Sequence, residues 1–171
     1  SDLRCSWAVP EMVTSAGGQA VVDRVGHAFM KQRMFEENAV FAGELSGHYY
    51  LRDFFGADSG IVPSLLVLEM LSKSGERLSE LLAPIERDHF ISWEINSRVD
   101  DPQGKIHILE QRYSDGEIAR TDGISVSYPD WHFNVRPSNT EPLLRLNLEG
   151  RTREWMEAKR DEILAVIRDG A

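Results

Sequence analysis

Two short stretches of the sequence combine residue types that could perform chemistry. The first is GELSGH, residues 43–48, in which Glu44, Ser46 and His48 stand between two largely apolar runs. A glutamate accepts hydrogen bonds, a serine donates and accepts them, and a histidine can also move a proton near neutral pH. This combination indicates a site for a ligand with several hydroxyl groups. An ordinary solvated hairpin turn is the alternative that the residue types leave open.

The second stretch is RPSNTEP, residues 136–142, which lies between two predicted strands. It places the guanidinium of Arg136, the hydroxyls of Ser138 and Thr140 and the amide of Asn139 within five positions. Arginine offers a planar fork of donors to a phosphate, and hydroxyls and loop amides can satisfy the remaining oxygens. The stretch therefore predicts a phosphate site. Because serine, asparagine and threonine are also common turn residues, a loop that carries an arginine by chance is the alternative.

Composition limits the kinds of protein that this chain can be. Its 171 residues allow one domain of ordinary size or two small ones, and the net charge of -9 argues against a nucleic-acid surface. The single cysteine, Cys5, excludes an internal disulfide and a thiolate metal site, and we expect it to be a small buried apolar residue. No apolar run approaches ~20 residues, so we expect no membrane span. The chain begins without Met inside structured-looking sequence, and we expect it to be an excised piece of a longer protein.

The first half alternates between strand and helix patterns. This alternation predicts an α/β domain over residues 1–85, with a mixed sheet and layered helices. The apolar residues Phe29, Met30, Met34 and Phe35 are predicted to form the core face of one helix. The predicted helices span residues 6–16, 28–37, 61–73 and 76–82, the last ending near Pro84, and the predicted strands span 19–24, 39–43 and 49–52.

After a boundary at residues 84–88 the pattern changes. Residues 86–171 predict a smaller α+β domain, an antiparallel sheet with helices on one face. One helix begins at Asp101 and Pro102, and another spans 153–168, with Trp155, Met156, Ile163, Val166 and Ile167 expected to face inward. The predicted strands span residues 90–99, 117–121, 124–128, 131–135 and 143–148.

Both chemistry-bearing stretches resemble signature loops of the α-D-phosphohexomutase family. VGH at residues 25–27 and DSGI at residues 58–61 resemble the same family, so the resemblance covers nearly the whole chain. Within the family, Leu45 and Asn139 make the chain most similar to the bacterial phosphomannomutase/phosphoglucomutase branch. The resemblance implies the third and fourth domains of a four-domain protein, with the third domain truncated at its N-terminus.

The resemblance also implies roles for residues of the first domain. Glu44 and Ser46 would hold the hydroxyls that distinguish mannose-type from glucose-type sugars. His27 and His48 would line the same pocket, with His48 assisting proton transfer. Arg4 stands where relatives often carry a substrate-contacting lysine, and the substitution puts its role in doubt.

In the second domain, the resemblance implies that Arg136, Ser138, Asn139 and Thr140 clamp the phosphate that is not transferred. Arg145 lies beyond the motif, and a structural role is an equal alternative for it. The sugar loop and the phosphate loop are expected to face a common crevice.

The resemblance implies a reaction that this chain does not carry by itself. The parent enzyme would interconvert mannose or glucose 1-phosphate and 6-phosphate in the cytoplasm, through a hexose 1,6-bisphosphate and an enzyme phosphoserine. Neither the phosphoserine loop nor the Mg²⁺-binding loop of the family is found in this sequence, so we expect the fragment to be inactive without the missing N-terminal domains. Two alternatives remain: a stand-alone phosphosugar-binding module, and a fragment of a phosphoglucosamine mutase.

Overall fold

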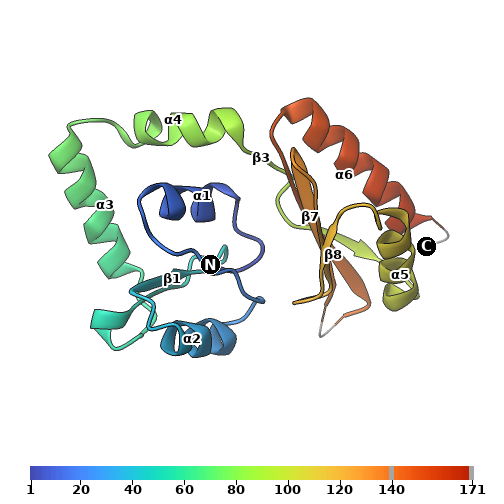
Figure 1. Ribbon diagram of the computed structural model, residues 1–171, viewed down its shortest axis with the longest axis horizontal. Coiled ribbons are helices and arrows are strands. Elements are labelled where there is room, and N and C mark those ends of the chain that lie inside the picture. Colours follow the sequence, from blue (N-terminus) through green and yellow to red (C-terminus); the bar gives the residue numbers. More distant parts are fainter. Residues whose placement is uncertain (139–140, 170–171) are drawn as a thin grey trace. The chain divides into compact units, whose positions relative to one another are not determined.

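The computed structural model describes residues 1–138 and 141–169. The chain divides into two compact units, which we call unit 1 (residues 1–87) and unit 2 (residues 88–171) (Figure 1). Within the described ranges, no helix is both long and apolar enough to cross a membrane.

Unit 1 combines helices with a short antiparallel hairpin, so its predicted α/β class is confirmed. Strand β1 pairs with β2 so that Ala42 lies opposite Tyr50. These two residues and two methionines of α2, Met30 and Met34, form the buried apolar cluster of the unit. The elements are α1 (Ala8–Ser15), α2 (His27–Glu36), β1 (Phe41–Gly43), β2 (Tyr49–Leu51), the 3-10 helix η1 (Arg52–Phe54), α3 (Ile61–Ser74) and α4 (Leu78–Asp88).

The predicted strand at residues 19–24 is wrong. In this part of the chain the structure has only an isolated parallel bridge between Asp2 and Asp23. The backbone bonds of the segment go to the first residues of the chain, with Ser1 N donating to Val21 O and Leu3 N donating to Asp23 O. A strand requires a continuous ladder with a partner, and the bonds of this valine-rich segment form only a single isolated bridge.

Helix α4 does not end before Pro84, as the sequence predicts, but continues through it to Asp88. A proline cannot donate to the carbonyl four residues earlier, which belongs to Glu80. Both residues are exposed, so water can bond that carbonyl. The predicted domain boundary after residue 85 lies inside this helix.

Two further expectations for unit 1 need correction. In α2, Met30 and Met34 are buried, but Phe29 and Phe35 are 41% and 88% exposed, so only half of the predicted apolar face enters the core. Cys5 is partly rather than fully buried. Its burial, with a smaller contribution from Asp2, raises the pKa of the thiol to about 11, so it remains protonated at neutral pH.

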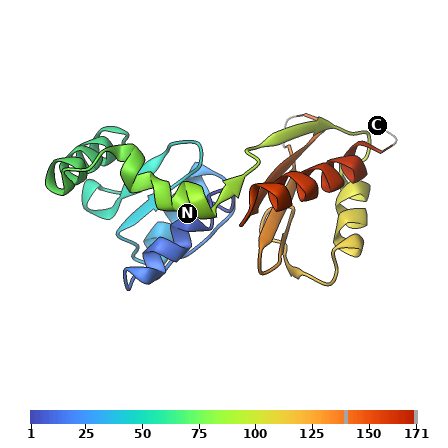
Figure 2. The same ribbon diagram turned by 90° about the horizontal axis from the view of Figure 1, so that it is seen from above.

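Unit 2 is an antiparallel sheet with two helices, which confirms the predicted α+β class (Figure 2). Its strand order is β3-β8-β7-β6-β5, and β4 also pairs with β8. Asp101 caps α5 by accepting from Gly104 N, and Thr152 caps α6 by accepting from Trp155 N. The elements are β3 (Phe90–Ile91), β4 (Ile95–Arg98), α5 (Pro102–Arg112), β5 (Glu117–Ala119), β6 (Ile124–Ser127), β7 (Trp131–Pro137), β8 (Leu143–Gly150) and α6 (Arg153–Arg168).

Alternation along β7 and β8 separates the two faces of this sheet. Phe133, Val135, Leu146 and Leu148 are buried in the core cluster that also holds side chains of α5 and α6. The residues between them point to the opposite face because successive strand residues alternate. That opposite face carries the polar side chains His132, Asn134, Arg136, Arg145, Asn147 and Glu149.

Two local expectations for unit 2 are wrong. The predicted strand at residues 90–99 is interrupted between β3 and β4, where Trp93 has a φ of 57°. In α6, Trp155 is 49% exposed instead of buried, whereas Leu164 is buried. The position of Trp155 in the first turn of α6 lets Lys159, one turn later, approach its ring to 5.6 Å.

Candidate functional site

The turn at residues 43–48 joins β1 to β2 and is closed by two backbone hydrogen bonds. Glu44 N donates to His48 O, and Gly47 N donates to Glu44 O. Gly47 has a φ of 83°, a conformation that favours glycine. The turn therefore fixes the backbone of Glu44 while Ser46 remains exposed at its tip.

Glu44 is only 6% exposed, and its carboxylate is held by a tyrosine. The hydroxyl of Tyr50 donates to Glu44 Oε1 at 2.6 Å, and the same hydroxyl lies 2.8 Å from His27 Nδ1. Burial and the bond to Glu44 raise the pKa of Tyr50, so its hydroxyl remains a donor. Because its one proton goes to Glu44, the geometry requires His27 to donate from Nδ1, which leaves Nε2 as an acceptor when the ring is neutral.

His48 lies beside this group. Its ring is 6.3 Å from the ring of His27 in an edge-on arrangement, and its Nδ1 is 3.8 Å from Asp58 Oδ2. The structure thus brings three predicted residues, Glu44, His27 and His48, into one cluster within unit 1. The sequence reasoning missed Tyr50 as a member, although alternation along β2 puts it on the same side as His48.

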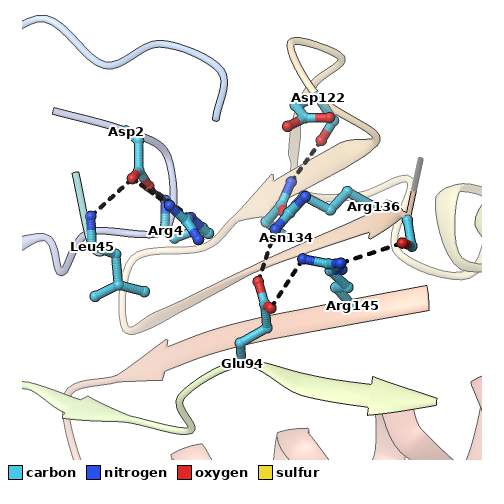
Figure 3. A network of polar contacts seen from close by, with 9 residues as sticks. Asp2, Arg4, Leu45, Glu94, Asp122, Asn134, Arg136 and Arg145 are labelled. Carbon is cyan, nitrogen blue, oxygen red and sulfur yellow. Dashed lines mark hydrogen bonds and ion pairs between the residues drawn. The ribbon is translucent and has the colours of Figure 1, made fainter. Parts of the chain in front are cut away.

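Arg4, the remaining predicted residue of unit 1, is tied to the GELSGH turn through Asp2 (Figure 3). Arg4 Nη2 pairs with Asp2 Oδ2 at 2.8 Å, and Arg4 Nε donates to Asp2 Oδ1 at 3.1 Å. Asp2 Oδ2 also accepts from Leu45 N at 2.9 Å, and the Asp2 side chain is fully buried. This ion pair connects the segment of Arg4 to the residue that follows Glu44. Asp2 was also missed by the sequence reasoning.

In unit 2, Arg136 of the predicted phosphate loop lies near the end of β7 and is only 7% exposed. Its Nη2 pairs with Glu94 Oε2 at 2.8 Å. Arg145, directly opposite in the β7–β8 register, pairs through Nη1 with Glu94 Oε1 at 3.4 Å. Arg145 Nη2 donates to Ser138 Oγ at 3.2 Å (Figure 3). Two guanidiniums, a carboxylate and a hydroxyl therefore form one group.

The loop itself is described only in part, because Asn139 and Thr140 lie outside the described residues. Ser138 N donates to Leu143 O at 2.8 Å, which holds the start of the loop to the start of β8. The Nε atoms of Arg136 and Arg145 are buried without a hydrogen-bond partner in the described structure. Such donors can bind the oxygen atoms of an anion or of water.

The residues 1–138 and 141–169 contain no group of three or more His, Cys, Asp and Glu side chains that could hold a metal ion. A cavity of about 310 Å³ in unit 1, lined in part by Lys31, Phe35, Arg52 and Phe55, includes none of the predicted site residues.

Comparison with known proteins identifies the family of both units. The family model described as "Phosphoglucomutase/phosphomannomutase, alpha/beta/alpha domain III" matches residues 1–87, and that of the C-terminal domain of the same family matches residues 94–166. A phosphomannomutase of Salmonella montevideo is 44% identical over 97% of this chain and 37% of its own length. A protein of Xanthomonas campestris named "Phosphohexose mutases" is 44% identical over 98% of this chain and 38% of its own.

A solved structure agrees with these matches. The crystal structure of a phosphoglucomutase/phosphomannomutase family protein from Burkholderia thailandensis aligns with a TM-score of 0.80 at 28% identity, over 99% of this chain and 37% of the other. The chain spans little more than a third of the length of these relatives. With both family models matched in order along nearly its whole length, the chain belongs to the phosphoglucomutase/phosphomannomutase family, of which it comprises domain III and the C-terminal domain.

Proposed function

We propose that this chain is the substrate-binding portion of a phosphomannomutase/phosphoglucomutase. The parent enzyme would interconvert the 1-phosphate and 6-phosphate of mannose or glucose through a bisphosphorylated sugar and an enzyme phosphoserine. The observation that carries the proposal is the group in unit 2, where buried Arg136 and its neighbour Arg145 converge with Ser138, and where the Nε atoms of both arginines have no hydrogen-bond partner among the described residues. A sugar phosphate would supply the acceptors that these donors lack.

Unit 1 supports the other half of the proposal, recognition of the sugar. Glu44 is held by Tyr50 and can accept further hydrogen bonds, as sugar hydroxyls would require. Ser46, at the exposed tip of the turn, would contact the same hydroxyls. His48, in edge-on contact with His27, is placed to accept or donate a proton. We keep Arg4 as a proposed substrate contact, held in place by Asp2.

The proposed reaction explains why a protein would carry both kinds of site. The bisphosphorylated sugar has a phosphate at each end, and each phosphate must be presented in turn to the phosphoserine. One phosphate clamp and one set of hydroxyl contacts can then hold the sugar in either of two opposite orientations. The names of the relatives favour a mannose-type or glucose-type sugar over glucosamine.

Titration of this chain with mannose 1-phosphate tests the proposal. We expect binding that weakens at least about tenfold in Arg136→Ala, because the variant loses a charge-assisted bidentate donor. Arg120→Ala is the matched control, because Arg120 is an exposed arginine of unit 2 that pairs with Glu110. Unchanged affinity in Arg136→Ala, or no binding by the unmodified chain, would contradict the phosphate assignment.

The parent enzyme offers a second test. The full-length protein should convert mannose 1-phosphate and glucose 1-phosphate to the 6-phosphates, and glucosamine 1-phosphate far more slowly. Preference for the amino sugar would support the phosphoglucosamine mutase alternative. A natural reading frame without phosphoserine and metal loops would support a binding module without catalysis.

A further inference from the structure

The cavity of about 310 Å³ in unit 1 combines charged and apolar side chains, and we call it the α2 cavity. Helix α2 contributes Lys31, Met34 and Phe35, and the 3-10 helix η1 with the residue after it contributes Arg52 and Phe55. None of these residues belongs to the proposed sugar or phosphate sites. A volume of roughly 300 Å³ is at the lower end of the range for small-molecule pockets, so the cavity is large enough for a small ligand.

The apolar wall of the α2 cavity is largely open to solvent. Phe35 is 88% exposed and Phe55 is 96% exposed, so neither ring packs into the core of unit 1. Met34, which lines the same cavity, is buried and belongs to that core. Single exposed apolar residues are common, but apolar side chains gathered around one cavity are typical of a binding site. The two rings are therefore placed to pack against a ligand.

The backbone that presents Phe55 has an uncommon conformation. Phe55 follows η1 with a φ of 59°, in the left-handed region that bulky residues rarely adopt. Asparagine and glycine are the usual residues at such positions, as Asn38 illustrates after α2 with a φ of 48°. Burial of the ring does not compensate for the strain at Phe55, because the ring is exposed. Residues held in this way cluster at functional sites, which favours a role for Phe55 outside the core.

The two cations of the α2 cavity have capacity for an anion. Lys31 is partly buried and makes no ion pair among the described residues, and its ammonium lies 5.8 Å from the centre of the Tyr50 ring. Arg52 donates to Asn38 O and Oδ1 at 3.4 and 3.5 Å, and to the exposed Asp53 at 3.3 Å. These distances exceed those of typical hydrogen bonds, and exposed ion pairs contribute little. Both cations can therefore bind another acceptor.

The charge of the cavity differs from that of the chain. The sequence has 28 acidic and 19 basic residues, but among the described residues that line the cavity there are two cations and no carboxylate. An anion that approaches the cavity is therefore attracted to it although the whole chain is negatively charged.

We propose that the α2 cavity is a binding site for a small anion that carries an aromatic ring. Lys31 and Arg52 bind the anionic group, and Phe35 and Phe55 pack against the ring. The anionic group is a carboxylate or a phosphate, since ammonium and guanidinium groups bind both. Because no lining residue belongs to the proposed sugar or phosphate sites, binding here does not depend on the proposed function.

Nuclear magnetic resonance with three probes tests the site in the unmodified chain. Naphthoate should cause saturable shifts of the backbone amide signals of Phe35, Asn38 and Phe55. Naphthamide, which has the same shape without the charge, should bind at least about 5-fold more weakly. Naphthyl phosphate distinguishes the two anionic groups, and the tighter of the two anions identifies the kind of ligand. Equal binding of naphthoate and naphthamide would overturn the proposal.

The position of the shifts is a second criterion. Helix α3 exposes several apolar side chains, among them Leu65 and Leu68, and adsorption of a ring to any apolar surface would shift its amide signals. Shifts in α3 that equal those at the α2 cavity would overturn the proposal, as would the absence of shifts at millimolar naphthoate.

Variants separate the contributions of charge and ring. Lys31→Gln and Arg52→Gln should each weaken naphthoate binding by about 3- to 10-fold and leave naphthamide binding unchanged. Lys73→Gln is the control, because it removes the same charge from an exposed lysine of α3 that pairs with Glu69. Phe55→Asn removes the ring and suits the left-handed backbone, so it should fold normally and bind both compounds more weakly. Unchanged naphthoate affinity in Lys31→Gln or in Phe55→Asn would overturn the proposal.

Two further measurements identify other occupants of the cavity. If the amide signals of Phe35 and Phe55 shift when the free chain is diluted, the cavity is an interface between two copies of the chain. If naphthoate binds this chain but not the full-length parent protein, another part of the parent covers the cavity. Either result would overturn the proposal, whereas equal naphthoate affinity in both proteins would support it.

Discussion

At the scale of single residues, the carboxylate of Glu44 is buried in unit 1 and held by a tyrosine. Burial of a charged group is costly unless hydrogen bonds compensate for its lost hydration. Tyr50 supplies such a bond at 2.6 Å, and the fully buried position of Tyr50 keeps its hydroxyl directed at the carboxylate. The Glu44 carboxylate is thus fixed by a side chain that belongs to the next strand of the same hairpin.

The variant Tyr50→Phe should expose the cost of this buried charge. We expect the free energy of unfolding to fall by about 1–3 kcal/mol, because the carboxylate of Glu44 loses a donor without gaining access to water. Equilibrium unfolding in urea, followed by circular dichroism, measures the change.

The neighbouring tyrosine provides the control. Tyr49→Phe also removes one phenolic hydroxyl, but it keeps the aromatic ring that stacks on Phe41. Its effect on stability should be below about 0.5 kcal/mol. Equal losses in the two variants would show that the bond to Glu44 contributes little.

At the scale of elements, strand pairing places the guanidiniums of unit 2. The antiparallel register of β7 and β8 puts Arg136 opposite Arg145, and β4 adds Asn96 on the other side of Arg145. The turn between β5 and β6 packs onto this region at Gly123, where an added Cβ would lie 2.1 Å from Val135 O and 2.6 Å from the Cα of Arg136. That turn therefore supports the strand at Arg136, the residue that begins the proposed phosphate loop.

Replacement of this glycine should be more damaging than replacement of a glycine with space around it. Gly123→Ala adds a backbone clash to the strain of a φ of 66°, whereas Gly75→Ala meets only the strain of a φ of 72° at the end of α3. We expect about 1–2 kcal/mol of lost stability for Gly75→Ala and a further 1–3 kcal/mol or so for Gly123→Ala. Urea unfolding of both variants measures the difference, and similar losses would contradict the close approach.

Much of this element structure could be predicted from local signals, and the failures have a common cause. Asp101 with Pro102 marked the start of α5, and Gly75 marked the end of α3, because caps act within one turn. The strand expected at residues 19–24 failed because a strand depends on a partner elsewhere in the chain. The prediction that Phe35 is buried was wrong for a similar reason. Periodicity shows which residues share a helix face, but not how much of that face other elements cover.

In the candidate site, too, local signals could be read from the sequence, whereas contacts between distant residues could not. Glu44 and Arg136 could be proposed as site residues because they stand in short motifs whose residue types indicate chemistry. Glu94 and Asp2 could not, because the contacts that join them to the two motifs cross long separations, 42 residues from Glu94 to Arg136 and 43 from Asp2 to Leu45. The ion pair of Asp2 with Arg4 is local, but it does not reveal the contact with Leu45. A single sequence contains no signal that links such positions. The residues that contact the proposed site residues from distant parts of the chain are therefore harder to predict than the proposed site residues themselves.

At the scale of the whole molecule, the two units differ in the size of their cores. Among the described residues, the core cluster of unit 2 contains sixteen buried apolar side chains, and that of unit 1 contains four. Helices α3 and α4 of unit 1 bury no residue, and α3 exposes Ile61, Leu65 and Leu68. Because stability rises with the apolar area removed from water, the difference should favour unit 2.

Hydrogen exchange of backbone amides should resolve this difference. We expect amides in β7 and β8 to exchange at least tenfold more slowly than those in β1 and β2, a difference of about 1.4 kcal/mol or more in opening free energy. Within unit 1, α2 and α3 form a matched pair of helices, but α2 buries Met30 and Met34 whereas α3 buries nothing. Amides of α2 should therefore be the better protected. Uniform protection across all four strands and both helices would mean that the chain opens as one cooperative body, and that the small core of unit 1 does not limit its stability.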